Sequence, residues 1–229
     1  MNTVWLPGTL CDERVFGDLP DILGEPAHHV TMSDFSNVGD AAAATSDTVS
    51  QRFVAIGFSL GGFVALELLR RAPERVAGVV LISGNAHPDT PANADARREE
   101  IRFARENGMP ALIGRSWPRL VGLSSRADAG LLQVLIDMAE SVGLEGLSHQ
   151  AEMNISRPDL RATAADAAVP LLLVAGGEDR LCPLERYAAA ASGATASLEV
   201  VPDAGHFLSL EAPHALATIV MPFMRRLAQ

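Results

Sequence analysis

A serine between glycines stands where a strand-like segment meets a helix-like segment. Residues 57–62 read Gly-Phe-Ser-Leu-Gly-Gly, which matches the pattern Gly-x-Ser-x-Gly. The apolar run Phe53–Phe58 leads into this turn, and the helical pattern Leu60–Arg71 follows it. A sharp strand-to-helix turn of this kind holds its serine in a strained conformation with the hydroxyl exposed, and the glycines leave room for the turn. The pattern therefore predicts that Ser59 is a nucleophile.

A serine hydroxyl becomes a good nucleophile only when a base removes its proton. His206 is our candidate base, because its small-residue loop Pro202–Phe207 follows the strand-like run Leu198–Val201. In open α/β folds, ligands and catalytic groups gather in such loops at the carboxyl edge of the sheet. The other histidines are expected to have ordinary structural or surface roles, with contact to substrate as the alternative for His87 and His149: His28, His29, His87, His149 and His214.

A carboxylate must orient the imidazole and stabilise its charged form. Asp179 is our candidate, because it follows the apolar run Leu171–Ala175 in a Gly-Gly-Glu-Asp turn. The adjacent Glu178 is the alternative acid. The order along the chain is serine, acid, histidine, which differs from the order in the chymotrypsin and subtilisin folds.

The elements that must position these residues follow a simple alternation. Short apolar runs alternate with helical patterns, which predicts an α/β fold with a mostly parallel sheet of about six strands flanked by helices. The expected strands are Val4–Leu6, His29–Met32, Phe53–Phe58, Val76–Ser83, Leu171–Ala175 and Leu198–Val201. The expected helices are Leu60–Arg71, Leu184–Ala191 and a last helix around Pro213 to Leu227, and Ala41–Ala44 is interpreted as a helix face.

Residues 87–157 break this alternation, because they contain several helical patterns and no convincing strand. Thr90-Pro91 can start a helix that Asn107-Gly108 ends. Ser125–Asp128 resembles a capping box ahead of the apolar run Leu131–Met138. We therefore expect a core made of residues 1–86 and 158–229, with a helical insertion at 87–157.

Taken together, these features resemble the α/β-hydrolase superfamily over nearly the whole chain. The matching segments are the serine turn 57–62, the acid loop 176–183 and the histidine loop 205–206. The resemblance implies a catalytic triad of Ser59, Asp179 and His206, and it makes 87–157 the family's helical cap over the active site. The chain begins almost at the first parallel strand, so we expect no counterpart of the antiparallel strands that precede it in the family.

The segment Leu6–Leu10 resembles the family's oxyanion loop, with Pro7 where many members have histidine. The backbone N–H groups of Leu60 and Thr9 are expected to hold the developing oxyanion, with Leu10 as the alternative to Thr9. Substrate contacts are expected from Leu10, Trp117 and Phe207. Trp117 and the methionines of the insertion (Met109, Met138 and Met153) could instead form the core of the cap.

The composition excludes several classes of chemistry. The chain has 229 residues, 18 basic and 28 acidic, with a formal net charge of −10, and none of its basic residues is lysine. Without lysine there is no Schiff base, no Walker lysine and no Ser-x-x-Lys nucleophile. The acidic balance without a basic stripe argues against nucleic acid as a partner.

No motif for a metal or a dinucleotide cofactor is present, so we expect neither. The two cysteines, Cys11 and Cys182, are too few for a disulfide framework and are expected to be buried small side chains. The first residues show no signal-peptide pattern, and no apolar run approaches the ~20 residues of a membrane span. These observations predict a cytoplasmic protein.

The expected function is that of a serine hydrolase which cleaves a small carboxylic ester or lactone through an acyl-enzyme on Ser59. The same triad in this superfamily also serves carbon–carbon bond hydrolysis, thioester cleavage, elimination and peracid formation. A non-catalytic ligand-binding protein of the same fold is the rival from another class. The triad does not separate these functions, because the shape of the cap selects the substrate.

Overall fold

The computed structural model describes residues 1–228. Within this range six strands form one parallel sheet, in the order β2-β1-β3-β4-β5-β6. The strands are β1 (Asn2–Leu6), β2 (Ala27–His29), β3 (Phe53–Phe58), β4 (Val76–Ile82), β5 (Leu171–Gly176) and β6 (Ala196–Val201). The expected α/β class and the number of strands are confirmed.

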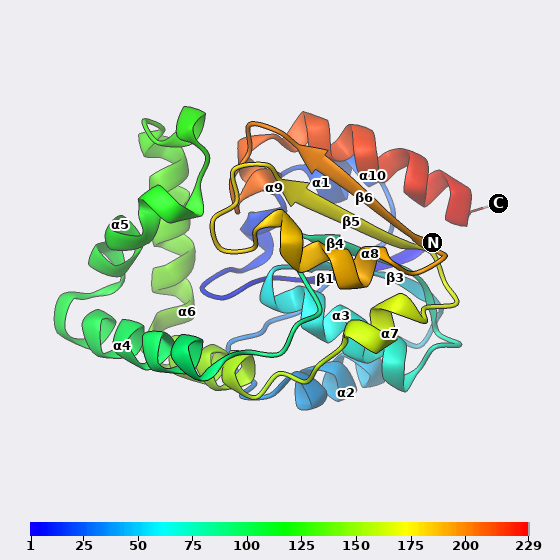
Figure 1. The fold of residues 1–229 in the computed structure, drawn as a ribbon, viewed down its shortest axis with the longest axis horizontal. Coiled ribbons are helices and arrows are strands. Elements are labelled where there is room, and N and C mark those ends of the chain that lie inside the picture. The colour runs from blue at the N-terminus through cyan, green and yellow to red at the C-terminus, as the bar shows by residue number, and fades with distance from the viewer. Residues whose placement is uncertain (229) are drawn as a thin grey trace.

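Helices cover both faces of the sheet (Figure 1). In the described range, one face carries four helices: η1 (Glu13–Phe16), α1 (Leu19–Leu23), α9 (Leu208–Glu211) and α10 (Pro213–Leu227). The other face also carries four: α2 (Val38–Thr48), α3 (Leu60–Arg71), α7 (Arg161–Ala165) and α8 (Ala188–Ala191). Successive side chains of β3 enter the two hydrophobic cores in turn, with Ile56 in one and Ala55 in the other. Every residue of β3, β4 and β5 is therefore buried, which explains their continuous apolar sequences.

Three helices lie together at the carboxyl ends of the strands (Figure 1). They are α4 (Pro91–Asn107), α5 (Met109–Leu120) and α6 (Ala129–Ile155), and we call them the cap helices. The short helix η2 (Leu123–Ser125) connects α5 to α6, and the described chain has no strand between β4 and β5. The Thr90 side chain accepts a hydrogen bond from Asn93 N–H and so caps α4 as expected. No helix in the described range is long and apolar enough to cross a membrane.

The second strand differs from its prediction. It covers Ala27–His29 rather than His29–Met32. It pairs with β1 up to Trp5, whose carbonyl oxygen accepts one more hydrogen bond from Val30 N–H, and the chain then leaves the edge of the sheet. The apolar pattern was misleading because Met32 is buried in a loop that packs on the core, whereas β2 itself is an edge strand with exposed residues.

Two helix predictions were also wrong in detail. The segment predicted as one helix at Leu184–Ala191 begins as the 3-10 helix η3 (Leu184–Tyr187) and continues as α8. The expected capping box at Ser125 is absent, because Ser125 belongs to η2 and α6 starts four residues later. Asp128 caps α6 instead, with its carboxylate accepting a hydrogen bond from Leu131 N–H.

The turn between β3 and α3 has no space for a side chain at Gly61. A Cβ atom there would lie 1.9 Å from the carbonyl oxygen of Leu6, which belongs to the neighbouring strand β1. This contact is with backbone, so rotation of a side chain cannot relieve it. The close approach of α3 to β1 therefore depends on the glycine.

We expect Gly61→Ala to lower the free energy of unfolding by about 1–3 kcal/mol, because an added methyl group in a packed site forces the backbone apart. Gly114→Ala is the matched control, since Gly114 lies inside α5 with no atom within 4 Å of an added Cβ. Alanine is the better helix former there and should raise stability by about 0.5–1 kcal/mol. Urea unfolding of both variants tests this, and equal changes would contradict the packing argument.

Candidate active site

Ser59 occupies the turn between β3 and α3 in a conformation that is unusual for a residue with a side chain. Its φ is 49° and its ψ is −110°. The Ser59 N–H donates to Ile82 O at 2.9 Å, and Gly62 N–H donates to Ser59 O at 3.0 Å, so the backbone of the turn is held from both sides. Its side chain makes no capping hydrogen bond to α3 and instead lines a cavity below the cap helices. The turn therefore presents the hydroxyl to that cavity.

A continuous hydrogen-bonded chain links Ser59 to a histidine and a carboxylate. His206 Nε2 lies 3.0 Å from Ser59 Oγ, and His206 Nδ1 lies 2.7 Å from Asp179 Oδ2. Within residues 1–228 no other histidine is within hydrogen-bonding distance of Ser59. The structure thus brings together the three residues singled out from the sequence, which we call the candidate triad. Such an arrangement can move a proton from the serine hydroxyl to the imidazole.

Asp179 is held in one orientation by the loop that follows β5. Its Oδ1 atom accepts hydrogen bonds from Leu181 N–H at 2.8 Å and Cys182 N–H at 2.9 Å, while Oδ2 faces His206. Burial acts to raise the pKa of Asp179, but the charge of His206 and these hydrogen bonds outweigh it and hold the pKa below its usual value. The carboxylate therefore stays ionised beside the imidazole.

The alternative acid, Glu178, has a different contact. Its carboxylate accepts a hydrogen bond from Leu123 N–H, in the segment between α5 and α6. The neighbouring carboxylate of Glu211 accepts hydrogen bonds from Gly122 N–H at 2.7 Å and Gly205 N–H at 3.1 Å. These two acids join the cap segment to the loops of the core, and in this structure Asp179 rather than Glu178 contacts His206.

The backbone of the histidine loop packs tightly against the end of α5. His206 N–H donates to Leu120 O at 3.0 Å. At Gly205, an added Cβ would lie 2.3 Å from Gly122 N, so only glycine permits this approach. Aromatic rings of Phe58 and Phe207 surround the imidazole, with ring centroids 5.3 and 5.8 Å from it. His206 is consequently buried, with 5% of its surface exposed.

Two backbone N–H groups near Ser59 are available to bind an oxyanion. Leu60 is the first residue of α3, where helical N–H groups have no partner within the helix, and Thr9 N–H has no acceptor among the described residues. Leu10 N–H is already engaged, because it donates to Gln150 Oε1 at 2.8 Å. This contact rules against Leu10 as the alternative donor and leaves Leu60 and Thr9 as the candidates.

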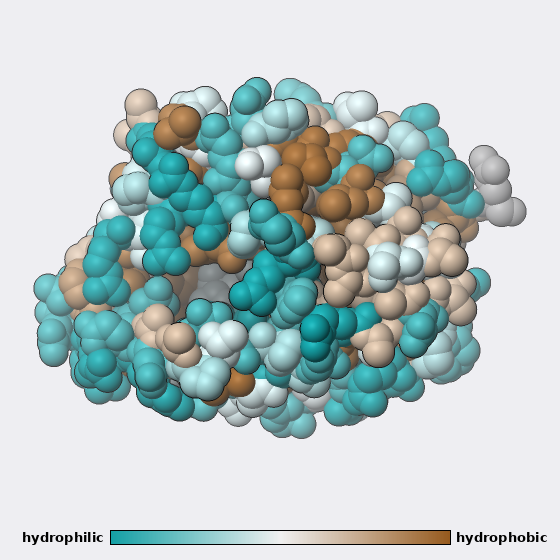
Figure 2. Space-filling view, viewed as in Figure 1, coloured by the Kyte–Doolittle hydropathy of each residue, from teal (hydrophilic) through white to brown (hydrophobic). Residues whose placement is uncertain are grey.

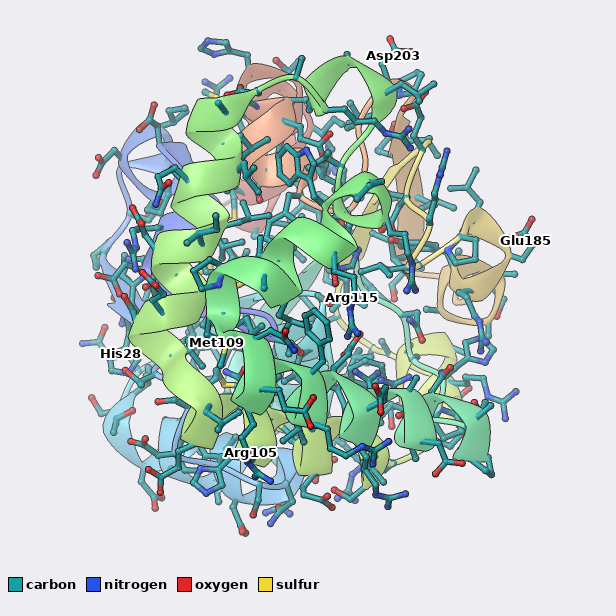
Figure 3. All side chains as sticks on the ribbon, turned by 90° about the vertical axis from the view of Figure 1, so that its left-hand side faces the viewer. His28, Arg105, Met109, Arg115, Glu185 and Asp203 are labelled. Carbon is teal, nitrogen blue, oxygen red and sulfur yellow. The ribbon has the colours of Figure 1, made fainter. Side chains whose placement is uncertain are left out.

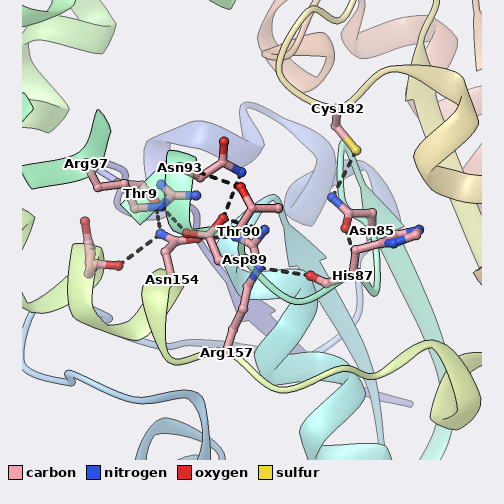
Figure 4. Close-up of polar contacts among 11 residues, drawn as sticks. Thr9, Asn85, His87, Asp89, Thr90, Asn93, Arg97, Asn154, Arg157 and Cys182 are labelled. Carbon is pink, nitrogen blue, oxygen red and sulfur yellow. Dashed lines mark hydrogen bonds and ion pairs between the residues drawn. The ribbon is translucent and has the colours of Figure 1, made fainter. Parts of the chain in front are cut away.

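Polar residues of α6 hold the candidate oxyanion loop, and sequence reasoning missed them. Gln150 accepts the hydrogen bond from Leu10, and Asn154 Nδ2 donates to Thr9 Oγ1 at 3.0 Å (Figure 4). Both side chains are buried, and the backbone of Leu10 is in the left-handed region with φ 57°. Their spacing of four residues on one helix face was the available signal, but a helix offers many such pairs.

Arg157 is a buried cation in the same network. It donates to Asn154 Oδ1 and His87 O, and its NH2 group lies 3.2 Å from Asp89 Oδ1 (Figure 4). Its guanidinium lies over the Phe63 ring, 4.5 Å from the centroid. Burial lowers the pKa of Arg157 to about 10, which leaves it charged at neutral pH. Arg157 therefore anchors the residue that contacts Thr9.

The cavity in front of Ser59 has a volume of about 430 Å³. Figure 2 shows it as a hollow between the cap helices and the core, with hydrophilic side chains along its rim. Leu10 and Phe207 line it, as expected from the sequence. Trp117 does not, because its ring is packed inside the cap and its Nε1 donates to Arg126 O at 3.0 Å. The expectation that Trp117 contacts substrate is therefore wrong for this cavity, and Trp117 belongs to the hydrophobic core instead.

The three methionines singled out within residues 87–157 and both cysteines are buried. Met109, Met138 and Met153 belong to the hydrophobic cores and are not among the residues that line the cavity. Burial raises the pKa of the Cys182 thiol to about 11 and also raises that of Cys11. In the described range, no group of three or more His, Cys, Asp or Glu side chains is placed to hold a metal ion.

We expect Asn154→Leu to lower the free energy of unfolding by about 1–3 kcal/mol, because it removes the hydrogen bonds that the buried Asn154 side chain makes to the half-buried Thr9 and Arg157. Asn107→Leu is the matched control: Asn107 is exposed at the end of α4 and also bonds the carbonyl four residues before it. The control should change stability by less than about 0.5 kcal/mol. Chemical unfolding tests this, and similar losses in both variants would show that the contact with Thr9 is unimportant.

Comparison with known sequences connects this site to a family. The sequence model described as "Alpha/beta hydrolase family" matches residues 6–219. The dihydrolipoyllysine-residue acetyltransferase component of the acetoin cleaving system of Pseudomonas putida is 28% identical over 97% of this chain, which spans 60% of that protein. A 2-succinyl-6-hydroxy-2,4-cyclohexadiene-1-carboxylate synthase of Enterobacter sp. is 28% identical over 97% of this chain and 91% of its own length. A pimeloyl-[acyl-carrier protein] methyl ester esterase of Yersinia enterocolitica is 27% identical over 83% of this chain and 76% of its own length.

Solved structures show the same fold. An esterase of Thermogutta terrifontis superposes with a TM-score of 0.89 at 22% identity, covering all of this chain and 91% of that one. The enol-lactonase of Burkholderia xenovorans superposes with a TM-score of 0.84 at 20% identity, covering 98% of this chain and 91% of that one. The sheet, the serine turn and the match of the family model over residues 6–219 agree, and the chain belongs to the α/β hydrolase family.

Proposed function

We propose that this protein is a serine hydrolase that cleaves carboxylic esters or lactones through an acyl-enzyme on Ser59. The observation that carries this proposal is the hydrogen-bonded chain from Ser59 Oγ through His206 to the buried Asp179, which opens on a cavity of about 430 Å³. Support also comes from relatives and structural neighbours named as a methyl ester esterase, an esterase and an enol-lactonase.

In the first half of the reaction, Ser59 Oγ attacks the ester carbonyl while His206 Nε2 takes the hydroxyl proton. The carbonyl oxygen becomes an oxyanion, which the N–H groups of Leu60 and Thr9 bind. His206 then gives its proton to the leaving oxygen, the acyl carbon–oxygen bond breaks, and an alcohol leaves. Asp179 stabilises the imidazolium that exists between the two proton transfers.

In the second half, water replaces the alcohol. His206 takes a proton from the water as it attacks the acyl-enzyme, and the same two N–H groups bind the new oxyanion. Collapse of this intermediate returns the proton to Ser59 and releases the carboxylic acid. In a lactone the leaving alcohol stays attached to the acyl group, so one hydroxy acid is the product.

We also propose that residues 87–157 form a cap that selects the substrate. The cap helices lie across the carboxyl ends of the strands, and α4, α5 and α6 all contribute residues to the cavity wall, among them Glu100, Leu112 and Leu135. Because the triad chemistry is common to many reactions, the shape and charge of this wall decide which acyl groups reach Ser59.

An organophosphonate probe should modify Ser59 and no other residue, because only an activated serine reacts readily with it. Intact-mass measurement should show one adduct on the parent protein and none on Ser59→Ala. Ser83 is a useful internal comparison, since its buried hydroxyl lines the same cavity without a hydrogen-bond partner among the described residues. An adduct that persists in Ser59→Ala would place the nucleophile elsewhere.

Asp179→Asn should lower kcat for ester hydrolysis by roughly 10⁴-fold, because an amide neither stabilises the imidazolium nor selects the required tautomer. Glu178→Gln is the matched control, since an amide oxygen can still accept the hydrogen bond from Leu123 N–H. The control should retain most of the activity. A larger loss for Glu178→Gln than for Asp179→Asn, at equal stability, would reverse the assignment of the acid.

A panel of short esters, thioesters, lactones and diketones tests the reaction class. Turnover of esters or lactones that is lost in Ser59→Ala supports the proposed function. Turnover confined to the thioesters or diketones would replace it with another reaction of the same triad. Ligand binding without turnover of any substrate in the panel would favour a binding protein.

A further inference from the structure

The cavity in front of Ser59 is far more cationic than the protein as a whole. Its wall includes five arginines (Arg97, Arg119, Arg157, Arg180 and Arg186) and, within the described residues, one carboxylate, Glu100. The chain has only 18 basic residues and a formal net charge of −10. Burial raises the pKa of the Glu100 carboxyl, and the charges of Arg97, Arg119 and Arg115 oppose that shift. The positive charge is thus concentrated at this site against the trend of the rest of the molecule.

Two of the five arginines already have a carboxylate partner. Arg97 Nε lies 2.9 Å from Asp89 Oδ2, and Arg157 NH2 lies 3.2 Å from Asp89 Oδ1 (Figure 4). The Asp89 side chain is 2% exposed, and Arg157 also bonds protein oxygens on both sides of its guanidinium. These contacts connect α4 to the end of α6, so we assign Arg97 and Arg157 to the structure of the cap.

The other three arginines have no such partner. Within residues 1–228, the guanidinium groups of Arg119, Arg180 and Arg186 make no ion pair. Arg119 lies near the end of α5, whereas Arg180 directly follows Asp179 and Arg186 lies in η3. They therefore reach the same cavity from the cap side and from the core side, next to the candidate triad.

We propose that the substrate carries an anionic group, a carboxylate or a phosphate, which Arg119, Arg180 and Arg186 bind while its ester carbonyl lies at Ser59. This inference rests on the proposed function for the reacting end of the substrate. A guanidinium presents paired N–H donors that match the oxygens of either anion, and a partly enclosed site strengthens such hydrogen bonds. Because none of these three guanidinium groups forms an ion pair within residues 1–228, an anion in the cavity would be attracted to all of them.

The test compares two methyl esters of the same chain length. Methyl hexanoate ends in a methyl group, whereas the monomethyl ester of adipic acid, which we call the half-ester, ends in a carboxylate at the same position. We expect kcat/KM to be at least about tenfold higher for the half-ester, a factor that corresponds to about 1.4 kcal/mol. This preference should weaken as salt is raised, because Arg119 and Arg180 are exposed to solvent and Arg186 is half-buried. An equal or higher kcat/KM for methyl hexanoate would overturn the proposal.

The double variant Arg180→Gln/Arg186→Gln should remove most of this preference. Arg105→Gln is the matched control, because Arg105 lies at the end of α4 (Figure 3) and is not among the residues that line the cavity. This variant should keep the ratio of the two kcat/KM values. A preference for the half-ester that survives in the double variant would overturn the assignment. Thermal melts of the variants show whether any change reflects a loss of folding.

Two further measurements separate the possible anions and the two proposals. Adipate and inorganic phosphate are compared as competitive inhibitors of methyl hexanoate hydrolysis, and inhibition lost in the double variant identifies the anion that the arginines bind.

Calorimetry measures binding of the half-ester to Ser59→Ala. Binding that depends on Arg180 and Arg186, without turnover of either ester by the parent, would support the anion site while the hydrolase proposal fails. Turnover without arginine-dependent binding would overturn the anion site alone.

Discussion

Ser59 adopts a φ of 49° at the point where β3 ends and α3 begins, in a region of backbone conformation that residues with a side chain rarely occupy. The surrounding structure must hold this strained turn. Hydrogen bonds from Ser59 to β4 and from Gly62 to Ser59 do so, and the missing side chain of Gly61 lets α3 pack against β1. Because β3 lies beside β1 and β4 in the sheet, the turn places the hydroxyl among the loops that follow the neighbouring strands.

The parallel arrangement of the strands explains how distant residues meet at Ser59. All carboxyl ends lie at one edge of the sheet, so the loops after β1, β5 and β6 supply Thr9, Asp179 and His206 to the same place. The sheet also reverses its order between β1 and β3, which is where open α/β sheets form a crevice for ligands. The candidate site is therefore a consequence of topology as much as of any one motif.

Buried polar contacts connect the cap helices to both sides of the site. On one side Gln150 and Asn154 bind the loop of Thr9 and Leu10, and on the other Glu178 and Glu211 bind the segment after α5 next to the histidine loop. Buried hydrogen-bonding groups are costly to leave without partners, so the cap and the core loops must keep these positions together. A change in the cap can therefore alter the geometry at Ser59 as well as the shape of the cavity.

Local signals in the sequence were sufficient for the fold and the candidate triad. Continuous apolar runs predicted β3, β4 and β5 because both faces of the sheet are covered, and the glycines around Ser59 indicated the tight turn that precedes α3. The edge strand β2 was misplaced, since a solvent-exposed strand leaves little apolar pattern to read. Tertiary structure alone decided that Leu10 N–H is occupied by Gln150, that Trp117 belongs to the core of the cap, and that three arginines from separate segments share one cavity. The physical reason is that these facts depend on contacts between residues far apart in the chain, whereas strands, helices and tight turns depend on periodicity and on neighbours within a few residues.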